Sequence, residues 1–159
     1  QQNDLTDPSG LITPAPIDRY APVLVINVGQ GGGQIELEAY AHNRCGRTVD
    51  NEGALPAAPV IAEDGPPVFE TSLDIPVILN ALVKLDLAIP VQASESAGSY
   101  LCNFVSYHAY AYLAEHAPTT PALFVHVPPM HDRERDATTL AEIVRALEMI
   151  VITANRQAR

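Results

Sequence analysis

The chain has 159 residues, which is enough for one domain with a sizeable core. Hydrophobic residues make up 47% of it and charged residues 18%, a composition that excludes intrinsic disorder. Nine lysines and arginines stand against 19 acidic residues, giving a net charge of −10. We therefore expect neither nucleic acid nor an anionic membrane surface as a partner.

The sequence shows neither a membrane-spanning segment nor a secretory signal, and it contains two cysteines. No apolar run approaches the ~18 consecutive residues of a membrane span, and no basic segment followed by an apolar one marks a secretory signal. The two cysteines, Cys45 and Cys102, are too few for a disulfide framework or for a zinc site made of cysteine alone. We expect reduced thiols and a cytoplasmic location.

The first part of the chain changes character at residue 23. Residues 1–22 are polar and Pro-rich and predict an irregular segment, whereas residues 23–159 predict a single α/β domain. Residues 23–28 are apolar and β-branched, which indicates a strand buried on both faces of a parallel sheet. The glycines of residues 29–33 then allow the backbone to approach a ligand closely. The moderate alternation of residues 35–43 predicts a second strand.

The second part alternates helices with strands. Residues 44–67 are rich in Gly and Pro and predict a long loop that is functional or ordered against the core. A helix is expected over residues 75–85, with Asp74 as its cap and Pro76 in its first turn. The remaining predicted elements are strand 88–93, helix 99–115, strand 123–127 and amphipathic helix 138–153.

This alternation predicts a three-layer α/β/α sandwich around a mostly parallel central sheet. Sites in such sheets form outside the carboxyl ends of the strands, which here points to residues 29–33, residues 94–102 and His126. The loop 54–67 and the helix 138–153 are candidates for a homo-oligomer interface, although their apolar residues fit a core equally well.

Three residue types in this arrangement suggest nucleophilic chemistry. Cys102 lies near the start of a predicted helix, where the helix dipole favours a thiolate; the alternative is a small buried hydrophobic side chain. His126, near the end of a strand, is a candidate base for that nucleophile or a core histidine. Glu36 and Glu38 share one face of a strand, so spacing leaves both open as the carboxylate that orients His126.

Several short segments carry a family resemblance. Residues 96–103 read SAGSYLCN, residues 124–128 read FVHVP and residues 29–33 read GQGGG. Residues 38–43 read EAYAHN and residues 47–53 read RTVDNEG. In type and order these segments resemble the motifs of the pyroglutamyl peptidase I (pyrrolidone-carboxylate peptidase) family, including the spacing between its catalytic cysteine and histidine.

The resemblance implies a single α/β/α hydrolytic domain and a cysteine peptidase that removes an N-terminal pyroglutamyl group from peptides. It assigns Cys102 as nucleophile, His126 as general base and then acid, and Glu38 rather than Glu36 as the orienting carboxylate. The reaction would pass through a thioester acyl-enzyme, with backbone N–H groups near Cys102 holding the oxyanion.

The resemblance also implies the substrate contacts. Gln30, Tyr100 and Leu101 would meet the pyroglutamyl ring of a peptide or small amide substrate. No metal and no cofactor are implied.

The chain departs from the family at three places. Residues 1–22 contain no match to the family's N-terminal strand and aromatic pocket loop, and Gln34 and Ala39 stand where the family has arginines. These departures keep an alternative open: a homologue with a different specificity, or a binding or structural protein without turnover. A further alternative is a fragment that needs an N-terminal part to work.

Overall fold

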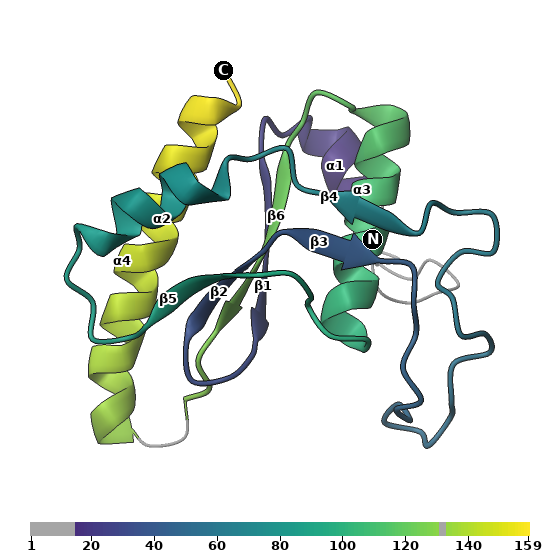
Figure 1. Ribbon diagram of the computed structural model, residues 1–159, viewed down its shortest axis with the longest axis horizontal. Helices are drawn as coiled ribbons and strands as arrows, with labels where there is room; N and C mark the ends of the chain where they lie inside the picture. Colours follow the sequence, from purple (N-terminus) through teal and green to yellow (C-terminus); the bar gives the residue numbers. More distant parts are fainter. Residues whose placement is uncertain (1–14, 131–132) are drawn as a thin grey trace.

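The computed structural model describes residues 15–130 and 133–159 (Figure 1). The elements in chain order are α1 (Ala15–Tyr20), β1 (Val25–Gln30), β2 (Ile35–Glu38), β3 (Tyr40–His42), β4 (Val68–Glu70), α2 (Ile75–Val83), β5 (Val91–Ser94), α3 (Leu101–His116), β6 (Ala122–Val127) and α4 (Arg133–Gln157). Within the described part of the chain, no helix is long and apolar enough to cross a bilayer.

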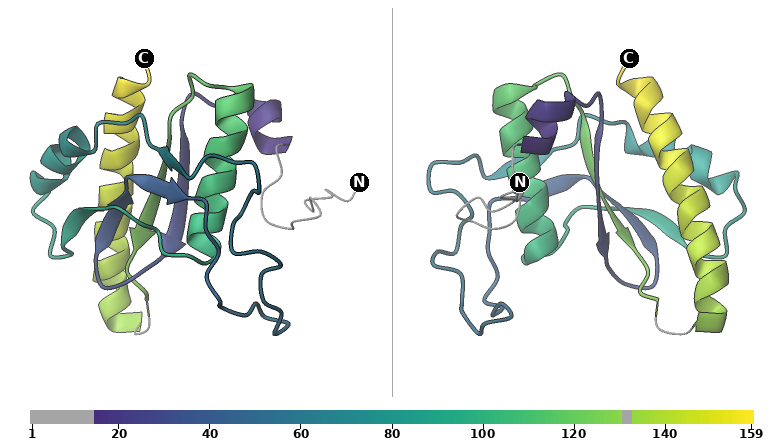
Figure 2. Two further views of the ribbon diagram at one scale, coloured as in Figure 1. Left: turned by 45° about the vertical axis from the view of Figure 1, so that its right-hand side comes forward. Right: turned by 180° about the vertical axis from the view of Figure 1, so that it is seen from behind.

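The main sheet has the strand order β1-β6-β2-β5. β1 pairs with β6 and β2 pairs with β5 in parallel, whereas β2 and β6 run antiparallel. The sheet is thus mostly parallel, as predicted. Helices α2 and α4 cover one face and α3 with α1 covers the other, which gives the three layers (Figure 2).

The ends of the other predicted elements shift by up to three residues, and four larger differences follow. The strand expected over residues 35–43 breaks at Ala39 into β2 of the main sheet and β3, which pairs with the unpredicted β4 in a second sheet. β1 is an edge strand and only half-buried, because it pairs with β6 alone. α1 lies inside the segment 1–22, which was expected to be irregular. α4 begins before residue 138 and ends beyond residue 153.

The helix α2 forms as its sequence predicts. The backbone N–H of Val77 donates to Asp74 Oδ1 over 3.0 Å, and Pro76 stands in the first turn. Asp74 thereby satisfies one of the N–H groups that a helix start leaves unpaired.

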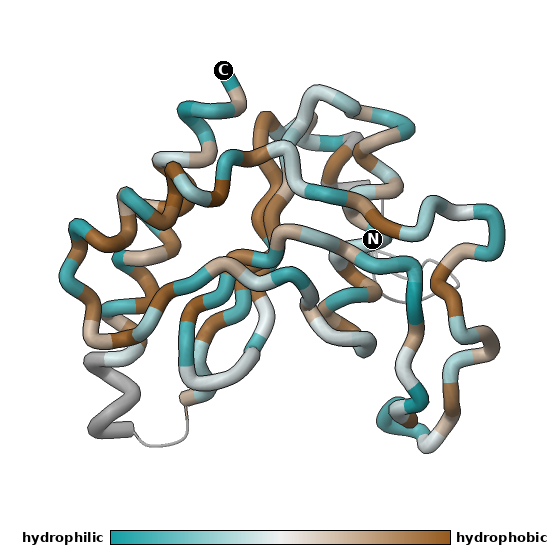
Figure 3. The backbone as a smooth tube through the Cα atoms, in the orientation of Figure 1, coloured by the Kyte–Doolittle hydropathy of each residue, from teal (hydrophilic) through white to brown (hydrophobic). Residues whose placement is uncertain are grey.

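Side-chain alternation along the two central strands separates the core from the site. Ile35 and Leu37 of β2, with Leu123 and Val125 of β6, are completely buried in the core beneath α2 and α4. Apolar colouring accordingly follows the strands in Figure 3. Because successive residues of a strand point to opposite faces, the residues between them face α3 instead.

A second core lies between α3 and the small sheet. It joins Ala41 of β3 to Tyr107, Tyr110 and Leu113 of α3. Phe69 of β4 packs edge-on against Tyr107, with ring centroids 5.0 Å apart. This packing fixes α3, and with it the start of that helix, over the polar face of the main sheet.

Candidate active site

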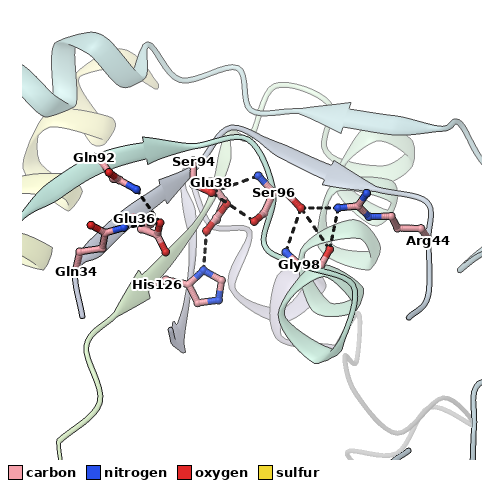
Figure 4. Close-up of polar contacts among 9 residues, drawn as sticks. All are labelled: Gln34, Glu36, Glu38, Arg44, Gln92, Ser94, Ser96, Gly98 and His126. Carbon is pink, nitrogen blue, oxygen red and sulfur yellow. Dashed lines mark hydrogen bonds and ion pairs between the residues drawn. The ribbon is translucent and has the colours of Figure 1, made fainter. Parts of the chain in front are cut away.

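The centre of the candidate site is a carboxylate–imidazole pair on adjacent strands. In the β2·β6 register Glu36 lies opposite His126, and Glu38 lies opposite Phe124, one diagonal step away. His126 Nδ1–H donates to Glu38 Oε1 over 2.6 Å (Figure 4). Glu38 is 1% exposed and His126 is 8% exposed, so the pair is shielded from water.

The thiol of Cys102 completes the cluster from the other layer. Cys102 is the second residue of α3, and its side chain hydrogen-bonds with the imidazole of His126. No side chain caps the start of α3 at Tyr100, which leaves first-turn N–H groups available to an anion. The helix N-terminus also favours negative charge on the sulfur.

His126 is strongly biased towards its protonated form. Hydrogen bonds to Cys102, and secondly to Glu38, raise the pKa of His126 to about 10, although burial alone would lower it. The favoured arrangement is therefore an imidazolium between two acidic partners. A thiolate paired with an imidazolium can attack a carbonyl carbon, and the imidazolium can then give its proton to a leaving amine.

Glu36 has different partners from Glu38. Glu36 Oε1 accepts hydrogen bonds from Gln34 Nε2 at 3.0 Å and from Gln92 Nε2 at 2.9 Å (Figure 4). The spacing of the sequence left Glu36 and Glu38 equivalent, whereas in the structure it is Glu38 that bonds the imidazole. Sequence reasoning missed Gln92, because only the parallel pairing of β2 with β5 brings it to Glu36.

The glycine-rich segment that ends β1 and continues into the loop before β2 approaches the site from the edge. A Cβ atom on Gly29 would lie 3.1 Å from Cys102 Sγ and 2.7 Å from the ring of Phe124. A Cβ atom on Gly31 would lie 2.8 Å from Cβ of His126. These two positions therefore require glycine for contact with the site's own side chains, a requirement that spacing alone did not show.

Asn103 fixes the start of α3 to the end of β3. Its buried amide donates to the carbonyls of His42 at 2.8 Å and Arg44 at 3.1 Å, and its Oδ1 accepts from the N–H of His42. Arg44 in turn donates to Ser96 Oγ at 2.7 Å and to the carbonyl of Gly98 (Figure 4). This network, which sequence analysis did not single out, positions the helix turn that carries Cys102.

A pocket of ≈ 280 Å³ opens beside this helix start. Tyr100 and Leu101, two of the predicted substrate contacts, line it, and Tyr100 donates a hydrogen bond to the carbonyl of Val49 over 3.2 Å. The third, Gln30, is exposed at the end of β1 and does not line this pocket. The other lining residues are Cys45, Thr48, Asp50, Ala54, Leu55, Pro56, Ser99 and Phe104.

An α/β/α sandwich with a thiol, an imidazole and a buried carboxylate in contact is typical of a cysteine hydrolase. Comparison with known proteins identifies one family within the class of cysteine hydrolases. The family model described as pyroglutamyl peptidase matches residues 11–157. The chain belongs to this family.

Individual relatives agree with the family assignment. The chain is 36% identical over 141 residues to a pyrrolidone-carboxylate peptidase of Streptococcus suis, covering 83% of this chain and 64% of that relative. It is 35% identical over 150 residues to one of Thermococcus onnurineus, covering 90% and 74%. The crystal structure of pyroglutamyl peptidase I from Bacillus amyloliquefaciens superposes with a TM-score of 0.78 at 31% identity, covering 89% of this chain and 70% of that one.

Proposed function

We propose that the chain is a cysteine-type omega peptidase that removes an N-terminal pyroglutamyl group from peptides. The observation that carries the proposal is that Cys102 and Glu38 both hydrogen-bond with one imidazole, that of His126. The family membership supports the substrate class, and the chain spans 64% of the length of the Streptococcus suis relative.

The proposed reaction begins with attack of the Cys102 thiolate on the acyl carbonyl of the pyroglutamyl residue. The oxyanion of the tetrahedral intermediate accepts hydrogen bonds from N–H groups at the start of α3. The imidazolium of His126 donates a proton to the leaving amine, and a thioester remains. His126 then takes a proton from water, which attacks the thioester and restores the thiolate–imidazolium pair.

Glu38 holds the ring orientation through this cycle. A carboxylate on Nδ1 fixes the tautomer in which Nε2 faces the reacting atoms, and its charge stabilises the imidazolium. The geometry that supports this role is the 2.6 Å bond to Nδ1 inside a buried environment.

The pocket beside α3 is the proposed site for the pyroglutamyl ring. Its lining includes the apolar side chains of Leu55, Leu101 and Phe104 and the ring of Tyr100. An uncharged lactam loses less solvation free energy in such a pocket than a free amino acid with a charged amine. Gln30 does not line this pocket, and its contact with the substrate remains a prediction.

The direct test is hydrolysis of a pyroglutamyl aminocoumarin amide. We expect cleavage by the wild-type chain and by Cys45→Ser, a matched control for loss of a thiol, and no cleavage by Cys102→Ser. Alkylation should also modify Cys102 faster than Cys45, because burial raises the pKa of the Cys45 thiol.

Two negative outcomes of this test would exclude different parts of the proposal. Cleavage that survives Cys102→Ser in a folded variant would exclude Cys102 as the nucleophile. A reactive Cys102 without cleavage of the pyroglutamyl amide would retain the nucleophile and exclude this substrate.

A further inference from the structure

Three side chains on the polar face of β2 and β6 form a compact set of metal-binding atoms. One carboxylate oxygen each of Glu36 and Glu38 and one ring nitrogen of His126 all lie within 4.8 Å of one another. In Figure 4 the carboxylate of Glu38 faces the imidazole of His126, and the carboxylate of Glu36 lies beside this pair, bonded to Gln34 and Gln92. Glu36, although next to the proposed catalytic pair, has no part in the reaction described above.

The charge of this set is unbalanced. Glu38 pairs with His126, whereas Glu36 is bonded by two neutral amides, so one imidazolium stands against two carboxylates. Glu38 Oε2 is buried and has no hydrogen-bond partner in the described part of the chain. The nearby cation of Arg44 donates to Ser96 and Gly98 instead. A buried oxygen without a partner is costly, and a cation would satisfy it.

We propose that Glu36, Glu38 and His126 form a binding site for Zn²⁺ that reversibly inhibits the peptidase. The inhibition rests on the proposed peptidase function, whereas the binding of Zn²⁺ does not. One imidazole and two carboxylates are a donor set that Zn²⁺ accepts with three protein ligands and one open position.

The residues around Glu36 hold its carboxylate in a way that suits a metal ligand. The amides of Gln34 and Gln92 both donate to Glu36 Oε1, which restricts the orientation of the Glu36 carboxylate. Metal-binding carboxylates are commonly held in this way by outer hydrogen bonds. Gln34 thus holds the Glu36 carboxylate without adding charge. An arginine at this position would place a positive charge beside the metal and would oppose its binding.

The inhibition follows from proton balance at His126. Zn²⁺ bound to Nδ1 displaces the proton of that nitrogen to solvent, and the carboxylate of Glu38 turns from Nδ1–H to the metal. The ring keeps its Nε2 proton and carries the metal on Nδ1. It can then neither form the imidazolium nor alternate between base and acid.

The binding is tested without relying on activity. Zn²⁺ is titrated calorimetrically into Cys102→Ser, in which the thiol cannot act as a ligand, and into the same variant with Glu36→Gln. The matched control adds Glu95→Gln, which removes an exposed carboxylate near β5. We expect one bound Zn²⁺ in Cys102→Ser and in the control, and an affinity at least about tenfold lower with Glu36→Gln.

The activity arm then tests regulation. In a protein with the Cys102 thiol, Zn²⁺ should inhibit hydrolysis, and Glu36→Gln should keep the basal rate while needing at least about tenfold more Zn²⁺ for inhibition. Absence of binding to Cys102→Ser, or an affinity unchanged by Glu36→Gln in a variant with native circular dichroism, would overturn the site. If no amide is cleaved at all, the calorimetry still decides the metal site, so the two failures are distinguishable.

Discussion

At the scale of single residues, His126 is the group on which the proposed chemistry depends. It hydrogen-bonds with a thiol from α3 and, through Nδ1, with a carboxylate from β2, and these partners together raise its pKa to about 10. The raised pKa favours the imidazolium at neutral pH, which is the form that holds a proton for the leaving amine in the proposed reaction. In that proposal the cysteine and the glutamate both act through this one ring.

Replacing Glu38 by Gln should shift the pH dependence of the reaction. Removal of the carboxylate lowers the pKa of His126, so the imidazolium is lost at a lower pH and the alkaline limb of kcat/KM moves down. We expect kcat/KM to fall by roughly 10²–10⁴-fold, as for loss of the orienting carboxylate in a triad. An NMR titration of the His126 ring measures the pKa directly.

Glu36→Gln is the control for this experiment. Its carboxylate is on the same strand face but is bound by two amides rather than by the imidazole. An equal shift of the His126 pKa in both variants would contradict the assignment of the orienting role to Glu38.

At the scale of elements, motifs and periodicity predicted residues that the structure brings together at the candidate site, but not how the segments pair. The alternation of residues 35–43 runs on through Ala39, so it contains no sign that β2 and β3 belong to different sheets. That break depends on the pairing of β3 with β4, a contact between distant segments. For the same reason the contact of Gln92 with Glu36 and the bonds of Asn103 to β3 could not be predicted locally.

The loop between β1 and β2 provides a test at this scale. Gly31→Ala places a Cβ atom 2.8–3.0 Å from three atoms of His126, so the imidazole has to move away from its partners. Gly32→Ala meets nothing within 4 Å and serves as the control. We expect kcat/KM to fall by roughly tenfold or more in Gly31→Ala, because small displacements in a catalytic site are costly, and to stay near wild type in Gly32→Ala.

Equal activity of the two loop variants would show that the ring tolerates the added methyl group. Circular dichroism and thermal unfolding of both variants separate a local displacement from loss of fold.

At the scale of the whole molecule, two cores hold the site between them. The core under α2 and α4 is formed by the apolar residues of β2 and β6, and the core around Tyr107 fixes α3 on the other face. The α/β/α architecture was predictable from the alternation of elements. The edge position of β1 was not, because an apolar run looks alike in a central and an edge strand.

Ile150→Ala tests the coupling of α4 to the sheet. Ile150 is completely buried, so its truncation should lower the free energy of unfolding by about 2–5 kcal/mol. Val151, its neighbour, is 45% exposed, and Val151→Ala should cost less than about 1 kcal/mol. Urea unfolding measures both, and similar losses in the two variants would contradict the packing of α4 by this face.

The antiparallel register of β2 and β6 has a consequence for how the chain selects its fold. A slip of one residue would place Glu36 opposite Val125 and Glu38 opposite Leu123 in the core, and Leu37 opposite Phe124. Buried carboxylates without a cation are strongly disfavoured, so the side chains of the proposed catalytic pair would also destabilise the misaligned sheet. The proposed catalytic pair thus also specifies the strand alignment, and selection for activity would at the same time be selection for correct folding.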